Sequence, residues 1–370
     1  MIIGIPKEIK EDEYRVGIVP AGVRELVSHR HKVFIEKNAG IGSGVSDEEY
    51  KREGAIVIDN PEEIYSQSDM IMKVKEPLPS EYSFLKKGQI LYAFLHLAPA
   101  KKLTEALLER EVIAIAYETV ELNDGSLPLL IPMSEVAGRM SVHEGAKYLE
   151  REKGGRGILL GGVPGVNPGN VVILGGGVVG SNAARMAVGA GANVTLLDTN
   201  LAKLRFLDDI FKGRMTTLSS NNHNIVASIE KADLVIGGVL IIGAKAPKLI
   251  TKAMLPSMQK GAVIIDVCID QGGTMETSRP TTHSNPTFVE EGIIHYCVAN
   301  MPGALSRTST FALTNATFPY ALQLANNGVI KSIQMNSALR KGVNIFKGQV
   351  TYSSVSRALN LPHTPIQSML

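Results

Sequence analysis

The chain has 370 residues, and its 38 Lys and Arg against 36 Asp and Glu leave a formal net charge of +2. That length exceeds an ordinary domain of about 100–200 residues, so we expect two domains. The balanced charge, without a basic block interleaved with aromatic residues, argues against a nucleic-acid partner and favours small-molecule chemistry. With 44% hydrophobic residues, 36 Gly and 5% aromatics, the composition is typical of an α/β protein with many tight turns.

Three features bear on where the protein works. Charged Lys7 and Glu8 follow a very short apolar start, so we expect no signal peptide. Residues 157–184 carry no charge, but their prolines and many glycines would break a helix, so we expect no membrane span. Cys268 and Cys297 form no CxxC pair and cannot build a disulfide framework, which predicts a reducing, cytoplasmic location.

The first third of the chain alternates short apolar segments with amphipathic ones. Strands are predicted at residues 2–5, 33–36, 56–58, 70–74, 90–95 and 112–116. Helices are predicted between them at residues 21–30, 46–54 and 101–111. Alternation of this kind implies right-handed crossovers and a mostly parallel sheet.

The same alternation restarts in the second half. Strands are predicted at residues 171–174, 194–198, 215–220, 233–240, 262–270 and 293–300. Helices are predicted at residues 181–192 and 201–211. This half therefore has the six-strand pattern of a nucleotide-binding domain.

The division between the halves is predicted within residues 127–133, which lead into a long helical stretch at 133–152. After Pro302 the chain turns helical through about Gly328 and ends in a short helical tail, which we expect to return to the first domain. The expected fold is α/β, with two doubly wound, Rossmann-like domains, parallel sheets and a cleft between them. One domain comprises residues 1–128 with 307–370, and the other residues 129–306.

A glycine-rich turn follows the first strand of the second half and opens a helix. In this GxGxxG, Gly175 permits the tight turn, Gly177 lets a pyrophosphate approach the backbone, and Gly180 lets helix and strand pack closely. Such a turn can be purely structural, but Asp198 ends the next strand about 20 residues later, where a carboxylate accepts ribose hydroxyls. Asp198 could instead cap the following helix. A carboxylate there favours NAD over NADP, although Lys203 nearby could weaken that preference.

Several polar residues follow predicted strands, where ligands of open α/β sheets bind. They are Arg15, Lys75, His96 and Glu118 in the first half, and Asp270 and Asn300 in the second. Any one of them taken singly is more often structural. Together they describe a site for an anionic carbonyl substrate, because Arg holds a carboxylate, Lys polarises a carbonyl and His moves protons near neutral pH.

The remaining signals are weaker. The histidines show no HExxH and no paired Cys/His spacing, so we expect no metal. Ser220 ends a predicted strand, where its hydroxyl could contact adenine or simply cap a turn.

The chain resembles the alanine dehydrogenase/pyridine nucleotide transhydrogenase family over essentially its whole length. The segments that carry the resemblance, in chain order, are GIPKEIKEDEYRVGIVPAGV, MIMKVKEP, YAFLHLA, IPMSEVAGRMSV, ILGGGVVGSNAARMA, VIIDVCIDQGG and VANMPGALSRTST. The resemblance implies reversible, NAD-dependent oxidative deamination of L-alanine to pyruvate and ammonia. It also implies carboxyl-terminal helices that return to the substrate domain, and a homohexamer.

By the same resemblance, Arg15 and Lys75 would bind the substrate, and His96 and Asp270 would be the acid/base groups. The cofactor positions implied are the glycine turn with Val178 and Val179, and then Ser134, Asp198, Lys203, Ser220, Val239, Leu240, Val267, Cys268, Ile269, Asp270, Arg279, Val298, Ala299, Asn300 and Met301.

Three other functions fit the same fold. A transhydrogenase-type nucleotide-binding component would act with membrane segments, and this sequence contains none. A saccharopine- or lysine-type dehydrogenase would need a longer, more acidic substrate pocket. A non-catalytic NAD-binding sensor would need only the nucleotide half, whereas Lys75, His96 and Asp270 are all present.

Overall fold

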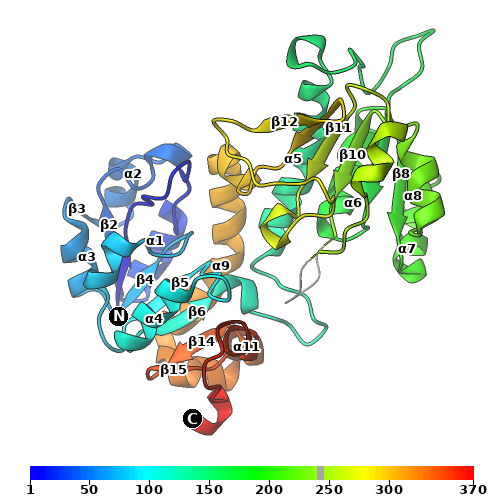
Figure 1. The fold of residues 1–370 in the computed structure, drawn as a ribbon. Helices are drawn as coiled ribbons and strands as arrows, with labels where there is room; N and C mark the ends of the chain where they lie inside the picture. The colour runs from blue at the N-terminus through cyan, green and yellow to red at the C-terminus, as the bar shows by residue number, and fades with distance from the viewer. Residues whose placement is uncertain (240–245) are drawn as a thin grey trace. The chain divides into compact units, whose positions relative to one another are not determined.

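The computed structural model describes residues 1–239 and 246–370. The chain forms two compact units, which we call unit 1 (Met1–Met133 with Gly303–Leu370) and unit 2 (Ser134–Pro302). In Figure 1, unit 1 contains the blue-to-cyan and the orange-to-red parts of the ribbon, so the two ends of the chain fold together.

Unit 1 is built on an eight-stranded sheet in the order β15-β14-β6-β5-β4-β1-β2-β3. Its strands are β1 (Ile2–Ile5), β2 (Lys32–Glu36), β3 (Ile56–Ile58), β4 (Met70–Met72), β5 (Ile90–Ala93), β6 (Ile113–Ala116), β14 (Val343–Phe346) and β15 (Gln349–Val350). The strands from β1 to β6 are parallel, and the strand order reverses between β1 and β4. In doubly wound sheets, such a reversal point is where ligands bind.

Several of the unit 1 helices begin at a residue whose side chain caps them. The helices of this unit are α1 (Pro20–Ser28), α2 (Asp47–Arg52), α3 (Pro61–Gln67), α4 (Lys101–Glu109), α9 (Ser306–Met335), α10 (Ser337–Lys341) and α11 (Ser353–Leu359). Ser46 and Glu49 form a reciprocal capping box at the start of α2. Asn60 caps α3, and Pro61 is the first residue of that helix. Proline fits this position because a backbone N–H there would have no acceptor within the helix.

The carboxyl-terminal part agrees with the sequence prediction at one point and departs from it at another. The first helix after Pro302 ends at Gly328, as predicted, because that residue has a non-helical φ of 71°; a second helix follows directly, and α9 spans both. The predicted helical tail also contains the strands β14 and β15, with β14 antiparallel to β6. These short strands lack a periodic pattern of their own; β14 is stabilised by its pairing with distant β6, and β15 by its pairing with β14.

Unit 2 is built on a seven-stranded sheet in the order β12-β13-β11-β10-β7-β8-β9. Its strands are β7 (Asn170–Leu174), β8 (Asn193–Asp198), β9 (Thr216–Ser219), β10 (Leu234–Gly237), β11 (Val263–Asp266), β12 (Thr287–Glu290) and β13 (Ile293–Tyr296). All neighbours are parallel except β12, which pairs antiparallel with β13 at the edge. The strand order reverses between β7 and β10.

The described residues between 131 and 302 form the α-helices α5 (Ile131–Tyr148), α6 (Val178–Gly189), α7 (Leu201–Phe211) and α8 (Asn222–Ile229). The core of unit 2 joins the strand side chains to the small inward residues of α6, such as Ala183 and Ala187. Those alanines let the helix lie close against β7 and β8.

Two predicted strands of unit 2 end several residues earlier than expected. The strand predicted at 262–270 stops at Asp266, because that carboxylate accepts the N–H groups of Cys268 and Thr274 and turns the chain. The strand predicted at 293–300 stops at Tyr296. Asp270 and Asn300 therefore lie in the segments that follow the strands.

The α/β fold class is confirmed, since both sheets are mostly parallel and flanked by helices (Figure 1). Within residues 1–239 and 246–370, no helix combines the length and apolar character needed to cross a bilayer.

Candidate active site

Four polar residues lie at the carboxyl-terminal edge of the unit 1 sheet. Arg15 lies in the segment after β1, Lys75 follows β4, and His96 follows β5. Glu118 lies in a short 3-10 helix after β6. Because β1, β4, β5 and β6 are parallel neighbours, these segments share one edge, and the first two flank the point where strand order reverses.

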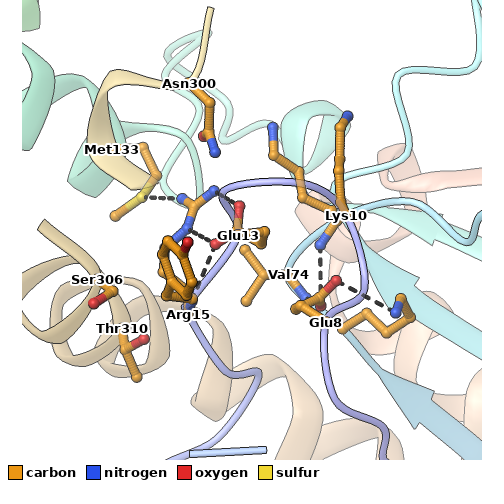
Figure 2. Close-up of polar contacts among 12 residues, drawn as sticks. Glu8, Lys10, Glu13, Arg15, Val74, Met133, Asn300, Ser306 and Thr310 are labelled. Carbon is orange, nitrogen blue, oxygen red and sulfur yellow. Dashed lines mark hydrogen bonds and ion pairs between the residues drawn. The ribbon is translucent and has the colours of Figure 1, made fainter. Parts of the chain in front are cut away.

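Arg15 is held by a carboxylate that the sequence analysis missed. Its Nε donates to Glu13 Oε1 at 2.7 Å and its Nη2 to Glu13 Oε2 at 2.5 Å, forming a bidentate pair (Figure 2). Burial alone would raise the pKa of Glu13, but the hydrogen bond and charge of Arg15 outweigh it and lower that pKa. Both side chains are almost fully buried.

The other end of the guanidinium contacts a thioether: Nη1 of Arg15 donates to Sδ of Met133 at 3.0 Å (Figure 2). The backbone beside Arg15 is anchored to α9, because the Val16 N–H donates to the Thr310 hydroxyl at 3.2 Å. That hydroxyl also contacts the Ser43 hydroxyl at 2.8 Å. The segment carrying Arg15 is therefore fixed at several points.

Lys75 emerges from a buried ionic network. Glu8 Oε1 accepts the N–H of Val74 at 2.6 Å and that of Lys75 at 3.3 Å. Its other oxygen lies 3.3 Å from the ammonium of Lys73, which also donates to Glu81 at 2.9 Å. Lys73 is fully buried, so these carboxylates satisfy its charge.

The Lys75 ammonium has a lowered pKa. Burial is the largest cause, and the positive charges of Arg15 and Lys10 add to it. This places Lys75 and Arg15 in one electrostatic environment. Two neighbouring cations, one of them poorly hydrated, make an environment that favours an anionic ligand.

His96 adopts a backbone conformation that is unusual for a side-chain-bearing residue, with φ of 47°. The Glu118 carboxylate accepts the N–H of His96 at 2.7 Å and the N–H of Leu95 at 3.3 Å. The same carboxylate lies 4.0 Å from Nδ1 of His96. The imidazole stacks on Phe94 with ring centroids 6.0 Å apart. It is 45% exposed, so it can exchange protons with a ligand or solvent.

The glycine turn of unit 2 has the geometry that the sequence predicts. Gly175 has φ of 98°, and a Cβ on Gly180 would lie 1.8 Å from the Gly175 carbonyl oxygen. A Cβ on Gly177 would meet no atom within 4 Å. Gly175 and Gly180 are thus required by the backbone geometry and packing of the turn. Gly177 faces open space at the start of the helix, which fits an approaching pyrophosphate.

Asp198 ends β8 beside this turn. Its Oδ2 accepts the Gly176 N–H at 2.7 Å and lies 3.3 Å from the Lys203 ammonium, while Oδ1 accepts the Asn200 N–H at 2.8 Å. Burial would raise the pKa of Asp198, but these donors lower it. The helix cap of α7 is Asn200, so the alternative role of Asp198 as that cap is wrong.

The other predicted cofactor residues lie mostly in segments that follow unit 2 strands. Ser220 follows β9 and donates its N–H to the Asp198 carbonyl at 3.0 Å. After the ends of β10, β11 and β13 come Val239, Val267, Cys268, Ile269, Val298, Ala299, Asn300 and Met301. Leu240 lies outside the described residues. Ser134 lies in α5, and the Arg279 guanidinium lies 4.2 Å from the Phe288 ring centroid.

Asp270 is exposed in a single 3-10 turn, Ile269–Gln271, after β11. Buried Asp266 organises this segment, since its carboxylate accepts the N–H of Thr274 at 2.8 Å and the hydroxyl of Ser278 at 2.6 Å. Asp270 thus lies at the same sheet edge as the glycine turn. Within the described parts of the chain, no group of three or more His, Cys, Asp or Glu could hold a metal ion.

Sequence reasoning missed the carboxylates that hold these groups, namely Glu8, Glu13 and Asp266, and it missed the buried Lys73–Glu81 pair. An acidic residue in the segment EDE before Tyr14 looks like any solvated charge. Only burial distinguishes Glu13 from its two acidic neighbours.

Comparisons with known proteins match the chain to one family. The family model "Alanine dehydrogenase/PNT, N-terminal domain" matches residues 4–137, and "Alanine dehydrogenase/PNT, C-terminal domain" matches residues 141–353. An alanine dehydrogenase of Methanococcus maripaludis is 58% identical, and one of Geobacillus stearothermophilus 54%, each over 100% of both chains.

Solved structures show the same fold. One described as L-alanine dehydrogenase matches with a TM-score of 0.95 and 50% identity, covering 97% of this chain and 99% of its own. A transhydrogenase from Sinorhizobium meliloti matches with a TM-score of 0.82 and 22% identity over 95% of this chain and 99% of its own, which shows likeness of fold alone. From the two family models and the full-length relatives, the chain belongs to the alanine dehydrogenase/PNT family.

Proposed function

We propose that this protein catalyses the NAD-dependent oxidative deamination of L-alanine to pyruvate and ammonia, and the reverse reductive amination. Full-length relatives at 53–58% identity are alanine dehydrogenases, so the chain is an amino-acid dehydrogenase. The observation that carries the proposal is the pair of neighbouring cations, Arg15 and Lys75, at the reversal point of the unit 1 sheet. A small 2-oxo acid matches that pair.

Arg15 would bind the substrate carboxylate, because a guanidinium presents parallel N–H donors to two oxygens. Lys75 would donate to the keto oxygen of pyruvate, stabilising negative charge as it develops there. One such donor is commonly worth about 3 kcal/mol. Because burial already disfavours its charge, Lys75 gains more from an anionic neighbour than an exposed lysine would.

The chemistry needs groups that move protons. The alanine amine must be neutral before its α-carbon is oxidised, since an ammonium cannot stabilise the iminium that forms. Water then adds to give a carbinolamine, and ammonia leaves as the carbon–nitrogen bond breaks. His96 and Asp270 would share these proton transfers, because both side chains are exposed and both residue types can serve as general acid or base.

Unit 2 has the features of a dinucleotide site, and NAD would bind along the glycine turn with its adenosine ribose at Asp198. The nicotinamide would supply the hydride acceptor of the reaction. The residues that would hold the cofactor are those at the carboxyl-terminal edge of the unit 2 sheet, with Ser134 and Arg279. The charge of Asp198 would disfavour a 2′-phosphate, and the nearby Lys203 would lessen that discrimination.

Two other functions from the sequence analysis are less well supported. A non-catalytic sensor would need only the nucleotide half, and does not account for the buried network that holds Lys75 or for the strained backbone of His96. The transhydrogenase from Sinorhizobium meliloti shares the fold at 22% identity, which carries no activity to this chain.

The assembly and location are part of the proposal. Family resemblance suggests a homohexamer, which the mass in solution would test. Both cysteines are buried free thiols, which fits a reducing compartment such as the cytoplasm.

A steady-state assay tests the proposal. NADH formation should require L-alanine, and pyruvate with ammonium should consume NADH. Serine, glycine and 2-aminobutyrate, each tested with NAD and NADP, define the specificity. Activity confined to another amino acid would refute the alanine assignment, and activity with NADP alone would refute the role of Asp198.

A further inference from the structure

Arg15 lies in an arrangement that a simple anion-binding site would not contain. A substrate carboxylate needs a cation, yet a carboxylate of the chain itself already pairs with this one through two hydrogen bonds. The Glu13 side chain has no exposed surface, and that of Arg15 is 2% exposed. Glu13 also accepts the backbone N–H of Arg15 at 3.1 Å.

The geometry of the pair fixes the plane of the guanidinium. Glu13 occupies the edge formed by Nε and Nη2, and Nη1 at the far end contacts Met133. A thioether sulfur is a weak acceptor, so a carboxylate would displace it readily. An arginine has a second edge, formed by Nη1 and Nη2, which can also hold a carboxylate by two hydrogen bonds.

We propose that Glu13 is the positioning residue of the substrate site: it clamps one edge of Arg15 and thereby directs the Nη1 end toward the substrate carboxylate, which replaces the Met133 thioether. The inference rests on the proposed function, because it takes a 2-oxo acid as the ligand of Arg15. It adds Glu13 to the site and specifies which part of the guanidinium contacts Glu13 and which part contacts the substrate.

A purely electrostatic view of Glu13 makes the opposite prediction. A buried negative charge beside a site for an anion repels that anion, so removing the charge should tighten pyruvate binding. If instead Glu13 orients Arg15, removing the clamp should weaken pyruvate binding. Loss of the clamp lets the guanidinium turn toward other acceptors, and loss of a partner is costly for a buried charge, so the orientation effect should dominate.

Two substitutions separate these views. Glu13→Gln removes the charge and turns one acceptor oxygen into an NH₂ group that faces N–H donors of Arg15, so the bidentate pair cannot form. Glu13→Asp keeps the charge but is shorter by one methylene and cannot reach both nitrogens in the same geometry. Glu53→Gln is the matched control, since Glu53 makes the same two-bond pair with Arg24 on the surface, at 2.5 and 2.6 Å.

The measurements are KM for pyruvate, KM for NADH, kcat and the melting temperature of each purified full-length protein. We expect KM for pyruvate to rise at least tenfold in Glu13→Gln and several-fold in Glu13→Asp, with KM for NADH unchanged. Glu53→Gln should keep all kinetic constants. This split between the two Michaelis constants is something that general loosening of the fold would not produce.

A KM for pyruvate that falls or stays constant in Glu13→Gln would overturn the proposal, as would a wild-type KM in Glu13→Asp. If Glu13→Gln does not fold, Glu13→Asp decides alone, because it keeps the buried charge pair. The proposed function is tested first in the wild-type protein. Lack of activity with alanine and pyruvate there would remove both, whereas normal wild-type activity with unaffected Glu13 variants would remove only this inference.

Discussion

Replacing Glu118 tests whether the structure holds His96 for the proposed proton transfers. The carboxylate accepts the His96 N–H at 2.7 Å and thereby supports a left-handed backbone, a conformation that costs a side-chain-bearing residue about 1–3 kcal/mol. A hydrogen bond to a charged group contributes about 1.5–3 kcal/mol, and one to a neutral group about 0.5–1.5 kcal/mol. Glu118→Gln should therefore reduce the stabilisation of this backbone conformation by about 1.4 kcal/mol, which corresponds to about a tenfold change in an equilibrium.

We expect kcat to fall about tenfold in Glu118→Gln, because the productive orientation of His96 becomes that much less populated. Glu118→Ala leaves the N–H groups of Leu95 and His96 without this acceptor. Its kcat should therefore fall by close to the roughly hundredfold loss expected for His96→Ala, which removes one acid/base group. Stopped-flow or steady-state consumption of NADH measures kcat, and NADH fluorescence measures cofactor binding.

The control for this series is Glu121→Gln, which changes a nearby half-buried carboxylate that pairs with Lys341. It should leave kcat and cofactor binding unchanged. Wild-type turnover in Glu118→Gln, or an equal loss of NADH affinity in all three His96 and Glu118 variants, would refute the reasoning. In that case the strained backbone at His96 would be structural.

Three further predictions concern unit 2. Asp198→Ala should raise KM for NAD at least tenfold and KM for NADP much less, and equal losses would contradict the ribose assignment. Gly180→Ala should lower the melting temperature and weaken NAD binding, because its Cβ meets a carbonyl oxygen, at a cost of about 1–3 kcal/mol; Gly189→Ala, with open space around it, should not. Burial lowers the pKa of His295 below its ordinary 6.5, so the unfolded chain binds a proton that the folded chain does not, and stability should fall as pH drops below about 6.5. His295→Asn should flatten this dependence in denaturant titrations, and an unchanged slope would contradict it.

Much of the architecture could be predicted from the sequence because local patterns encode it. The strands β1 to β6 alternate with amphipathic helices, and the glycine turn precedes a helix whose small residues pack on a sheet. The strands β14 and β15 could not be predicted, since β14 has four residues and pairs with distant β6, and β15 has two residues and pairs with β14. The ends predicted for β5 and β11 lie beyond the observed ones for a similar reason. Side chains of Glu118 and Asp266 turn the chain there, and apolar periodicity does not reveal them.

The same distinction between local patterns and distant contacts applies to the candidate site. Residues at strand ends, such as Lys75 and His96, could be singled out because topology brings parallel strand ends to one edge. The groups that hold them could not, because Glu8, Glu13 and Lys73 are distinguished only by burial. Their contacts join segments far apart in the chain, as between Glu8 and the backbone of Val74.

The proposed alanine dehydrogenation predicts a specific fate for the hydrogen on the substrate α-carbon. With L-alanine deuterated at that carbon, the account predicts that deuterium appears in the reduced nicotinamide ring of NADH and that turnover slows by a primary isotope effect when bond cleavage limits it. Mass spectrometry of the NADH formed by the wild-type protein measures this transfer directly. Deuterium released to water, with none in NADH, would contradict direct hydride transfer from alanine and with it the proposed reaction.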